Sequence, residues 1–257
     1  MSKKLKPTVQ AYAELQQAYD FFNERLFEAK LPPCLITFQR GKRFYGYYVE
    51  DRFFDSGAGV TTDEIALNPQ YFATVPLLEI LQTLVHEMVH LWQFRFGKPS
   101  RKCYHNREWA EKMKSVGLMP SSTGQPGGRE VGQSVADYAL PGGHFLRACA
   151  ELLSTAFRIT WMDRFPVTPG HVPTPAMIAG DPAVQQLVSL GAFSLPAAEA
   201  GPGMVVEQSS GAGSASNRSN RQKFTCAACG DNIWGKPTLA NVKHGGDCGD
   251  AMFEAGD

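Results

Sequence analysis

The stretch that decides the fold is Leu84–Trp92, LVHEMVHLW, which places an H-E-x-x-H motif inside an apolar run. Two imidazoles four positions apart on a helix differ by about 40° in azimuth and about 6 Å in height, so both can reach one metal ion. Glu87 lies between His86 and His90, where its carboxylate can hold the water molecule that a metal activates. The motif therefore predicts a zinc site of the hydrolytic kind.

The residues around the motif predict one long helix over 76–96. Pro76 suits the first turn of a helix and Gly97 suits its end, and most positions between them are apolar. A buried helix rarely carries two histidines and a glutamate, because burying such groups without partners is costly. A pair of core histidines with ordinary hydrogen-bond partners is the alternative, but a metal ion explains all three polar residues at once.

A catalytic zinc ion usually takes three protein ligands, so a third must come from elsewhere in the chain. His105 follows the short polar loop 98–102 and precedes Asn106, which can cap a helix over 106–116 that ends at Gly117. His105 is therefore the first candidate. The spacing leaves three nearby alternatives open: Cys103, Glu108 and Glu111.

Upstream of the motif, the chain alternates between helical and extended patterns. Apolar residues at spacings of three and four predict an amphipathic helix over 8–29, which Pro32 and Pro33 end. Three β-like runs follow, at 35–38, 44–49 and 65–67. The predicted fold class is α+β, with a zincin-like helical core against a small β-sheet.

These residues resemble those of the SprT-like (Spartan-type) zinc metalloprotease family. H-E-M-V-H-L-W, a short loop, H-N-R-E-W and a helix ending in S-V-G-L carry the resemblance, which covers residues 8–120. In that family a histidine follows H-E-x-x-H and an aromatic residue stands four positions later, as His105 and Trp109 do here. The segment 65–69, IALNP, is similar to the strand and turn before the family's motif helix.

The resemblance carries expectations about chemistry. It implies that His86, His90 and His105 bind the catalytic zinc ion and that Glu87 is the general base. It also implies proteolysis, which in some members acts on proteins crosslinked to DNA.

A second group of metal-ligand residues lies near the C-terminus. Cys226 and Cys229 form a C-x-x-C knuckle, and His244 and Cys248 follow. A Cys3His set is a closed, structural zinc site, so residues 224–257 are predicted to form a zinc ribbon. SprT-like proteins often carry such a ribbon, but here His244 stands one residue out of register with the expected cysteine, which leaves the fourth ligand open. Free thiols in a tail are the alternative.

The remaining segments complete the predicted organisation. The SprT-like domain over 8–120 is followed by a Gly- and Pro-rich extension over 121–195, whose first part is either an active-site flap or a loose connection. The extension is expected to contain a strand at 157–162 and a short helix at 183–190. A Gly-, Ser- and Ala-rich flexible linker over 196–223 then leads to the ribbon.

The charge composition limits how the chain could bind nucleic acid. Lys plus Arg number 25 and Asp plus Glu number 25, so no overall basic footprint for nucleic acid is present. The candidates for contacts to DNA are the ribbon and local basic clusters, for which ordinary solvated surface charge is the alternative. These are Lys3, Lys4 and Lys6; Arg40, Lys42 and Arg43; Lys98, Arg101 and Lys102; and Arg218, Arg221 and Lys223.

The cellular location is predicted from features that the sequence lacks. Its six cysteines do not suggest a disulfide framework, and no apolar run has the length of a signal peptide core or a membrane span. We therefore expect a cytoplasmic protein, free or associated with the nucleoid, with protein substrates and no membrane partner.

Three functions fit the pattern. The first is a zinc metalloendopeptidase for DNA-associated or DNA-crosslinked proteins, and the second is a non-proteolytic zinc protein that binds DNA or a transcription complex. The third is a zinc hydrolase for a non-protein amide. Glu87 favours an enzyme, because a structural metal site needs no base. Conceivable donors to the reaction's oxyanion are Tyr45, Tyr47, Tyr48 and Tyr104.

Overall fold

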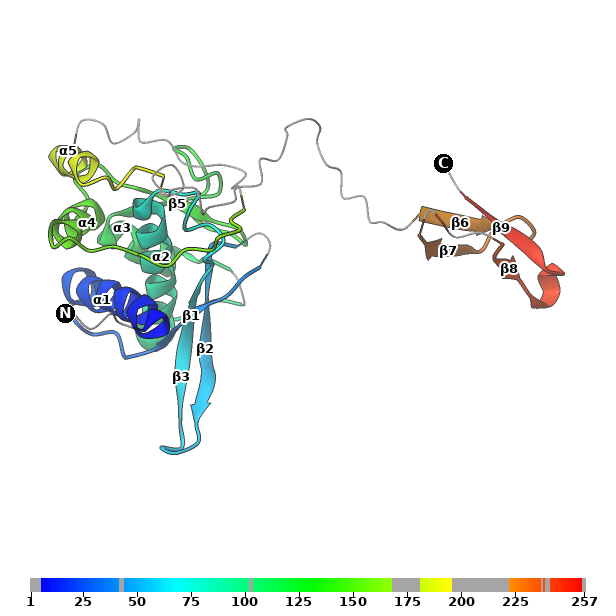
Figure 1. The fold of residues 1–257 in the computed structure, drawn as a ribbon, viewed down its shortest axis with the longest axis horizontal. Helices are drawn as coiled ribbons and strands as arrows, with labels where there is room; N and C mark the ends of the chain where they lie inside the picture. Colours follow the sequence, from blue (N-terminus) through cyan, green and yellow to red (C-terminus); the bar gives the residue numbers. More distant parts are fainter. Residues whose placement is uncertain are drawn as a thin grey trace. The chain divides into compact units, whose positions relative to one another are not determined.

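The computed structural model describes residues 6–41, 44–101, 104–167, 181–195, 222–236, 238 and 241–255. The chain divides into two compact units, Met1–Gln208 and Ser209–Asp257 (Figure 1). The first unit contains both the expected domain over 8–120 and the extension over 121–195. Most of the expected linker, residues 196–221, lies outside the described residues.

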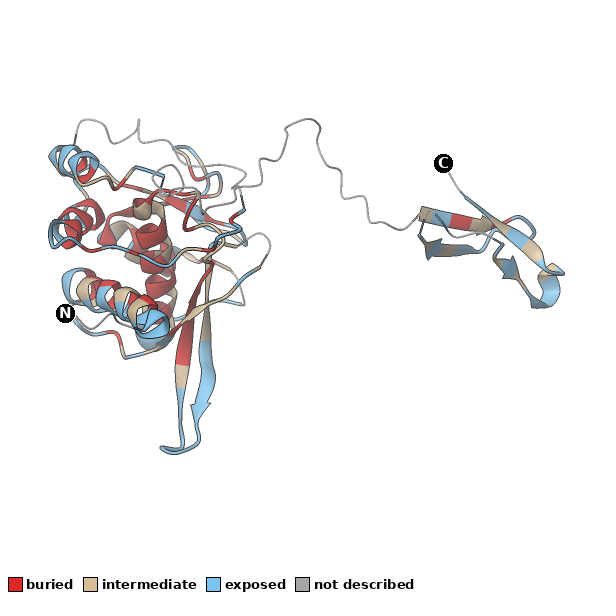
Figure 2. Cartoon of the chain, in the orientation of Figure 1, coloured by how far each residue is buried: buried red, intermediate tan, exposed pale blue. Residues whose placement is uncertain are grey.

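Helix α2 (Leu77–Phe96) carries the H-E-x-x-H motif and runs through the centre of the N-terminal unit (Figures 1 and 2). It begins directly after Pro76 and ends at Gly97, as the sequence predicts. Buried residues line most of its length because both the sheet and other helices cover it. The elements packed on α2 are β2 and β3 and the helices α1 (Pro7–Phe27), α3 (Arg107–Val116) and α4 (His144–Ser154).

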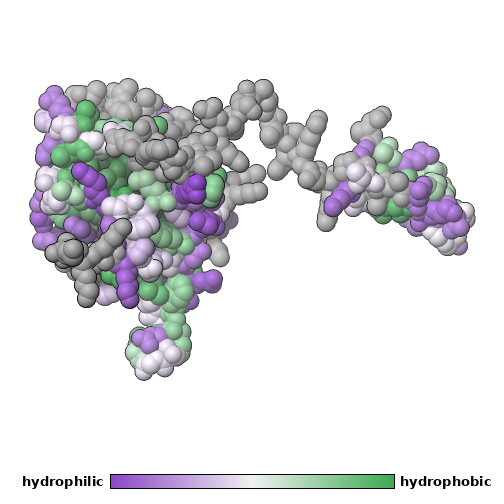
Figure 3. Space-filling model, in the orientation of Figure 1, coloured by the Kyte–Doolittle hydropathy of each residue, from purple (hydrophilic) through white to green (hydrophobic). Residues whose placement is uncertain are grey.

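The sheet of the N-terminal unit has the strand order β1-β3-β2. Strand β1 (Leu35–Phe38) pairs parallel with β3 (Val60–Leu67), and β2 (Gly46–Asp55) pairs antiparallel with it. The sequence predicts all three strands, but β2 and β3 continue beyond the predicted runs into a long hairpin. The outer part of this hairpin is exposed, so no hydrophobic alternation marks it, and its tip stands clear of the body (Figure 3).

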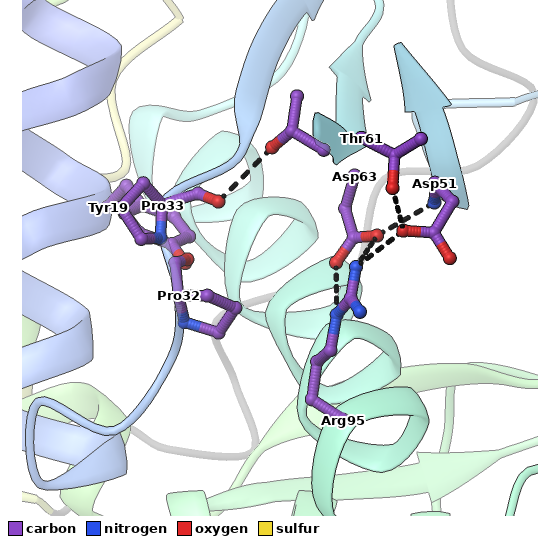
Figure 4. A network of polar contacts seen from close by, with 8 residues as sticks. Tyr19, Pro32, Pro33, Asp51, Thr61, Asp63 and Arg95 are labelled. Atoms are coloured by element: carbon purple, nitrogen blue, oxygen red, sulfur yellow. Dashed lines mark hydrogen bonds and ion pairs between the residues drawn. The ribbon is translucent and has the colours of Figure 1, made fainter. Parts of the chain in front are cut away.

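A charged cluster ties the hairpin to the end of α2 (Figure 4). The Arg95 guanidinium donates to both carboxylate oxygens of Asp63, at 2.9 and 2.5 Å, and to Asp51 at 3.0 Å. Asp51 has a positive φ of 44° at the point where the β2–β3 register shifts, and its N–H donates to Asp63 at 2.8 Å. Asp63 is almost fully buried, so the guanidinium supplies the charge that its burial requires.

The extension folds onto the same unit. Strands β4 (Leu118–Ser121) and β5 (Ala136–Ala139) form an antiparallel pair, and α5 (Pro182–Ser189) is the predicted short helix. The predicted strand at 157–162 is wrong: these residues form no strand. Their polar groups bond to side chains instead, because the N–H and hydroxyl of Thr160 both donate to Glu14 of α1, at 2.9 and 2.7 Å.

The C-terminal unit is a small four-stranded sheet in the order β7-β6-β9-β8. Its strands are β6 (Gln222–Cys226), β7 (Asn232–Gly235), β8 (Lys243–His244) and β9 (Ala251–Ala255), with a 3-10 turn at Gly246–Cys248. Only Phe224 and Cys226 are buried among its described residues. Such a small core predicts that something besides apolar packing stabilises the unit.

Among the described residues, no helix is both long enough and apolar enough to cross a bilayer.

Candidate active site

Three histidines from two elements meet beside α2. His86 and His90 lie on successive turns of that helix, and His105 lies in the loop just before α3. One ring nitrogen of each lies within 4.8 Å of the others. The structure thus brings together the three residues that the sequence suggested as ligands of one metal ion.

His105 is held in place by the connection between α2 and α3. Asn106 caps α3 as predicted, since its side chain accepts the N–H of Trp109 at 3.0 Å. The buried Gln93 of α2 donates to Asn106 at 2.7 Å and to Glu108 at 2.8 Å. These bonds fix the start of α3 against α2 and set His105 opposite His90.

The alternative third ligands lie elsewhere. The Glu108 carboxylate accepts the N–H of Lys98 at 2.6 Å in addition to the Gln93 amide, so these two donors satisfy it. Glu111 is exposed on α3, outside the histidine group. Cys103 lies outside the described residues. So do seven residues of the basic clusters: Lys3, Lys4, Lys42, Arg43, Lys102, Arg218 and Arg221.

Two backbone-anchored partners orient two of the histidine rings. Nδ1 of His86 lies 2.7 Å from Oδ2 of Asp137 on β5, and Nδ1 of His105 lies 3.2 Å from the carbonyl oxygen of Gly132. If each Nδ1 carries the donated proton, each Nε2 keeps its lone pair for a metal ion. Asp137 is itself anchored, because Gln82 of α2 donates to its carbonyl oxygen at 3.0 Å.

Two of the three imidazole rings are held in the neutral form that can bind a metal ion. Burial holds the pKa of His90 well below its usual value and lowers that of His105 to about 4, so both rings are neutral at pH 7. Burial also lowers the pKa of His86, but its bond to Asp137 and the charge of Glu87 outweigh burial and raise it. Nε2 of His90 and Nε2 of His105 lie 3.2 Å apart, an approach that a shared zinc ion explains.

Aromatic rings close the site on two sides. The Trp109 ring is fully buried and lies 4.9, 5.2 and 4.3 Å from the ring centroids of His86, His90 and His105. The Tyr48 ring stacks on His90, with centroids 6.5 Å apart and planes 9° apart. This packing fixes the ring orientations and lowers the dielectric around the site.

Glu87 faces a cavity of about 560 Å³ beside the histidines. Burial raises the pKa of its carboxyl to about 7, with His86 opposing the shift and Asp137 adding to it. Strand β2 approaches closely here, because a Cβ on Gly46 would lie 2.8 Å from Thr83 and 3.3 Å from Glu87. Of the four tyrosines suggested as oxyanion donors, Tyr45 lines the cavity.

Replacing Asp137 by Asn tests the orienting contact. We expect the Asp137→Asn variant to bind zinc at the histidine group about 10- to 100-fold more weakly, because a neutral amide orients and polarises the imidazole less than a carboxylate does. Competition of the full chain against a chromophoric chelator measures both affinities. Asp55→Asn, on the exposed hairpin, is the matched control, and an unchanged affinity in Asp137→Asn would contradict the orienting role.

The C-terminal unit brings together the second group of ligand residues. One ligand atom each of Cys226, Cys229, His244 and Cys248 lies within 4.8 Å of the others, and Cys229 Sγ lies 3.4 Å from His244 Nδ1. Backbone N–H groups at Cys229 lower the pKa of the Cys226 thiol and favour the thiolate that zinc binds. His244 therefore joins the group despite its irregular spacing.

The sequence matches one protein-family model and one curated relative. The model of the SprT-like family matches residues 15–127, which include the three histidines, Glu87 and Trp109. The chain belongs to the SprT-like family. A 59-residue stretch is also 61% identical to a Salmonella typhimurium relative described as "Uncharacterized protein in mucB 3'region", covering 23% of this chain and 80% of that relative. No solved structure matches.

Two contributors to the SprT-like site escaped the sequence analysis. Asp137 and Gly132 lie in the segment that the sequence left as either a flap or a loose connection. A lone aspartate on a four-residue strand matches no metal-binding motif, and Gly132 acts through its backbone carbonyl, so neither gave a signal in the sequence.

Proposed function

We propose that this SprT-like protein is a zincin-like, zinc-dependent metalloendopeptidase that cleaves proteins bound or crosslinked to DNA. The observation that carries the proposal is the group of three oriented imidazoles beside Glu87, at the edge of a cavity. Two neutral rings and one ring bonded to a carboxylate make a donor set that suits zinc and leaves a position free for water.

The chain's own residues supply the rest of the chemistry. His86, His90 and His105 would hold a zinc ion, which would supply Lewis-acid chemistry to a peptide carbonyl and to a water molecule. Glu87 orients that water, accepts its proton and passes it to the leaving amine. Asp137 and the Gly132 carbonyl hold the imidazoles still, while Trp109 keeps bulk water from their inner side.

The proposed partner is DNA, bound by the C-terminal unit as a zinc ribbon. Lys223 of β6 stands opposite Trp234 of β7, and Lys243 of β8 stands opposite Met252 of β9. The alternation along the strands puts these four side chains on the face opposite Phe224 and Cys226. Trp234 is 63% exposed, so an aromatic ring and two ammonium groups are available to a single strand.

The experiment that tests the proposal is cleavage of a protein crosslinked to DNA by the purified, zinc-loaded chain. We expect about two zinc ions per chain, and cleavage that DNA stimulates, that a chelator stops and that added zinc restores. Two bound zinc ions without cleavage of any protein substrate would overturn the protease assignment. That result would favour the alternative, a non-proteolytic zinc protein that binds DNA or a transcription complex through its Cys3His group.

Removing the exposed tryptophan tests the proposed DNA contact. Stacking of a base on an aromatic ring contributes about 1–3 kcal/mol, so Trp234→Ala should lower affinity for single-stranded DNA about 5- to 150-fold. Fluorescence anisotropy with a labelled oligonucleotide measures it. Trp161→Ala, which removes an exposed tryptophan from the N-terminal unit, is the matched control. Equal affinities for the two variants would exclude Trp234 from the DNA-binding surface.

A further inference from the structure

The cavity that His86 and Glu87 line also has acidic groups on its wall, one of which, Glu79, has no role in the metal site. His86 and Glu87 form one part of its lining, and Val75, Val135 and Ala136 form an apolar part. The remaining acidic groups in the lining are Glu79 and Asp137, and no lysine or arginine is among the described lining residues. The cavity therefore has one apolar wall and another that carries carboxyl groups.

Glu79 lies on α2 two turns before His86, which places it on the same face of the helix about 10 Å along the axis. Its carboxylate makes no hydrogen bond or ion pair with any residue that the structure describes. Burial raises the pKa of Glu79 to about 8, and the charge of Asp137 raises it further. A half-buried carboxyl with a raised pKa is stabilised in its ionised form when a cation arrives beside it.

Asp137 provides a second observation at this cavity, because one of its carboxylate oxygens lacks a hydrogen-bond donor among the described residues. It is only 7% exposed, and while its Oδ2 faces His86, its Oδ1 is buried without a partner among the described residues. The negative potential of this carboxylate reaches Glu79. Burial and the charge of Asp137 keep Glu79 largely protonated in the empty pocket, and a bound cation would favour its ionised form.

We infer that this cavity is a specificity pocket that takes a lysine or arginine side chain of the protein substrate, next to the bond that is cut. The inference deepens the proposed function and rests on it. The aliphatic stem packs on Val75, Val135 and Ala136, and the charged head donates to Glu79. Proteins that bind DNA neutralise phosphates with lysine and arginine, so such a pocket suits substrates of that class.

The test uses peptides in which one residue near the cleaved bond is lysine or norleucine, which has the same stem without the ammonium group. Binding is measured in full-length Glu87→Gln protein, which keeps the pocket and removes the proposed base. Cleavage of the same peptides is measured in protein with Glu87 intact. Each readout is repeated with Glu79→Gln, and Glu50→Gln, an exposed change on β2, is the matched control.

We expect lysine peptides to bind, and to be cleaved, about 10- to 100-fold better than norleucine peptides, because a charge-assisted hydrogen bond in a partly buried site is lost. Glu79→Gln should remove this preference by making the values for lysine and norleucine peptides equal, and Glu79→Lys should reverse it in favour of glutamate. Glu50→Gln should keep the wild-type preference.

The outcomes separate this inference from the proposed function. A lysine preference in binding that depends on Glu79, without cleavage of any peptide, would overturn the protease and leave the cation pocket standing. Equal binding of lysine and norleucine peptides, no binding of either, or a preference that survives Glu79→Gln would each overturn the pocket. Zinc content and circular dichroism of each variant confirm that a loss does not come from unfolding.

Discussion

The Glu87→Gln variant is expected to cleave protein substrates about 10²- to 10⁴-fold more slowly than the wild type, while it binds zinc equally well. This loss in rate equals the usual contribution of a general base, because the amide of glutamine accepts no proton from water at neutral pH. Zinc binding should persist because the ligand atoms belong to His86, His90 and His105. Substrate turnover measured alongside zinc content by mass spectrometry separates the two effects.

Glu50→Gln is the matched control for this experiment, because it makes the same chemical change at an exposed position on β2. Its turnover should equal that of the wild type. Activity within a few-fold of the wild type in Glu87→Gln would show that another group takes the proton. Loss of zinc in that variant would instead assign Glu87 a role in holding the metal.

Chelation of zinc is expected to unfold the C-terminal unit and leave the N-terminal unit folded. The described part of the C-terminal unit buries only Phe224 and Cys226, whereas structural zinc sites contribute about 10–16 kcal/mol of apparent binding energy. Hydrogen exchange of the full chain, read by mass spectrometry, should lose its protection over 222–255. The helix α1, which packs into a large apolar core, should keep its protection.

The Cys229→Ser variant should reproduce this loss without a chelator, because it removes one ligand of the Cys3His group. Cys34→Ser, which makes the same change in the N-terminal unit, should leave exchange over 222–255 as in the wild type. If residues 222–255 stay protected in Cys229→Ser, the unit does not depend on this metal site.

The elements that were predicted well are those with strong local signals. Pro76 and Gly97 flank α2, and Asn106 and Gly117 flank α3. These boundaries are predictable because the free N–H and C=O groups at a helix end favour particular residue types in the positions next to them. The three histidines predicted to share a metal ion do lie together, since few residue types bind such an ion and each left a signal in the sequence. The short helix α5 followed from its own apolar spacing.

The failures come from features that depend on distant parts of the chain. The segment 157–162 has a β-like pattern, but a strand needs a neighbouring strand, and here the side chain of Glu14 provides the partner. The outer hairpin is held by pairing within itself and by Arg95, so hydrophobicity gave no sign of it. Asp137 acquires its role only when β5 docks beside α2.

The position of Asp137 and Gly132 in the chain also sets where the protein can be shortened. The family model ends at residue 127, before both groups, although they orient two of the three histidines. A fragment that ends at residue 127 would retain His86, His90 and His105. It would lose the two groups that orient the His86 and His105 rings. A fragment that keeps both supports must therefore extend at least through β5, which ends at Ala139.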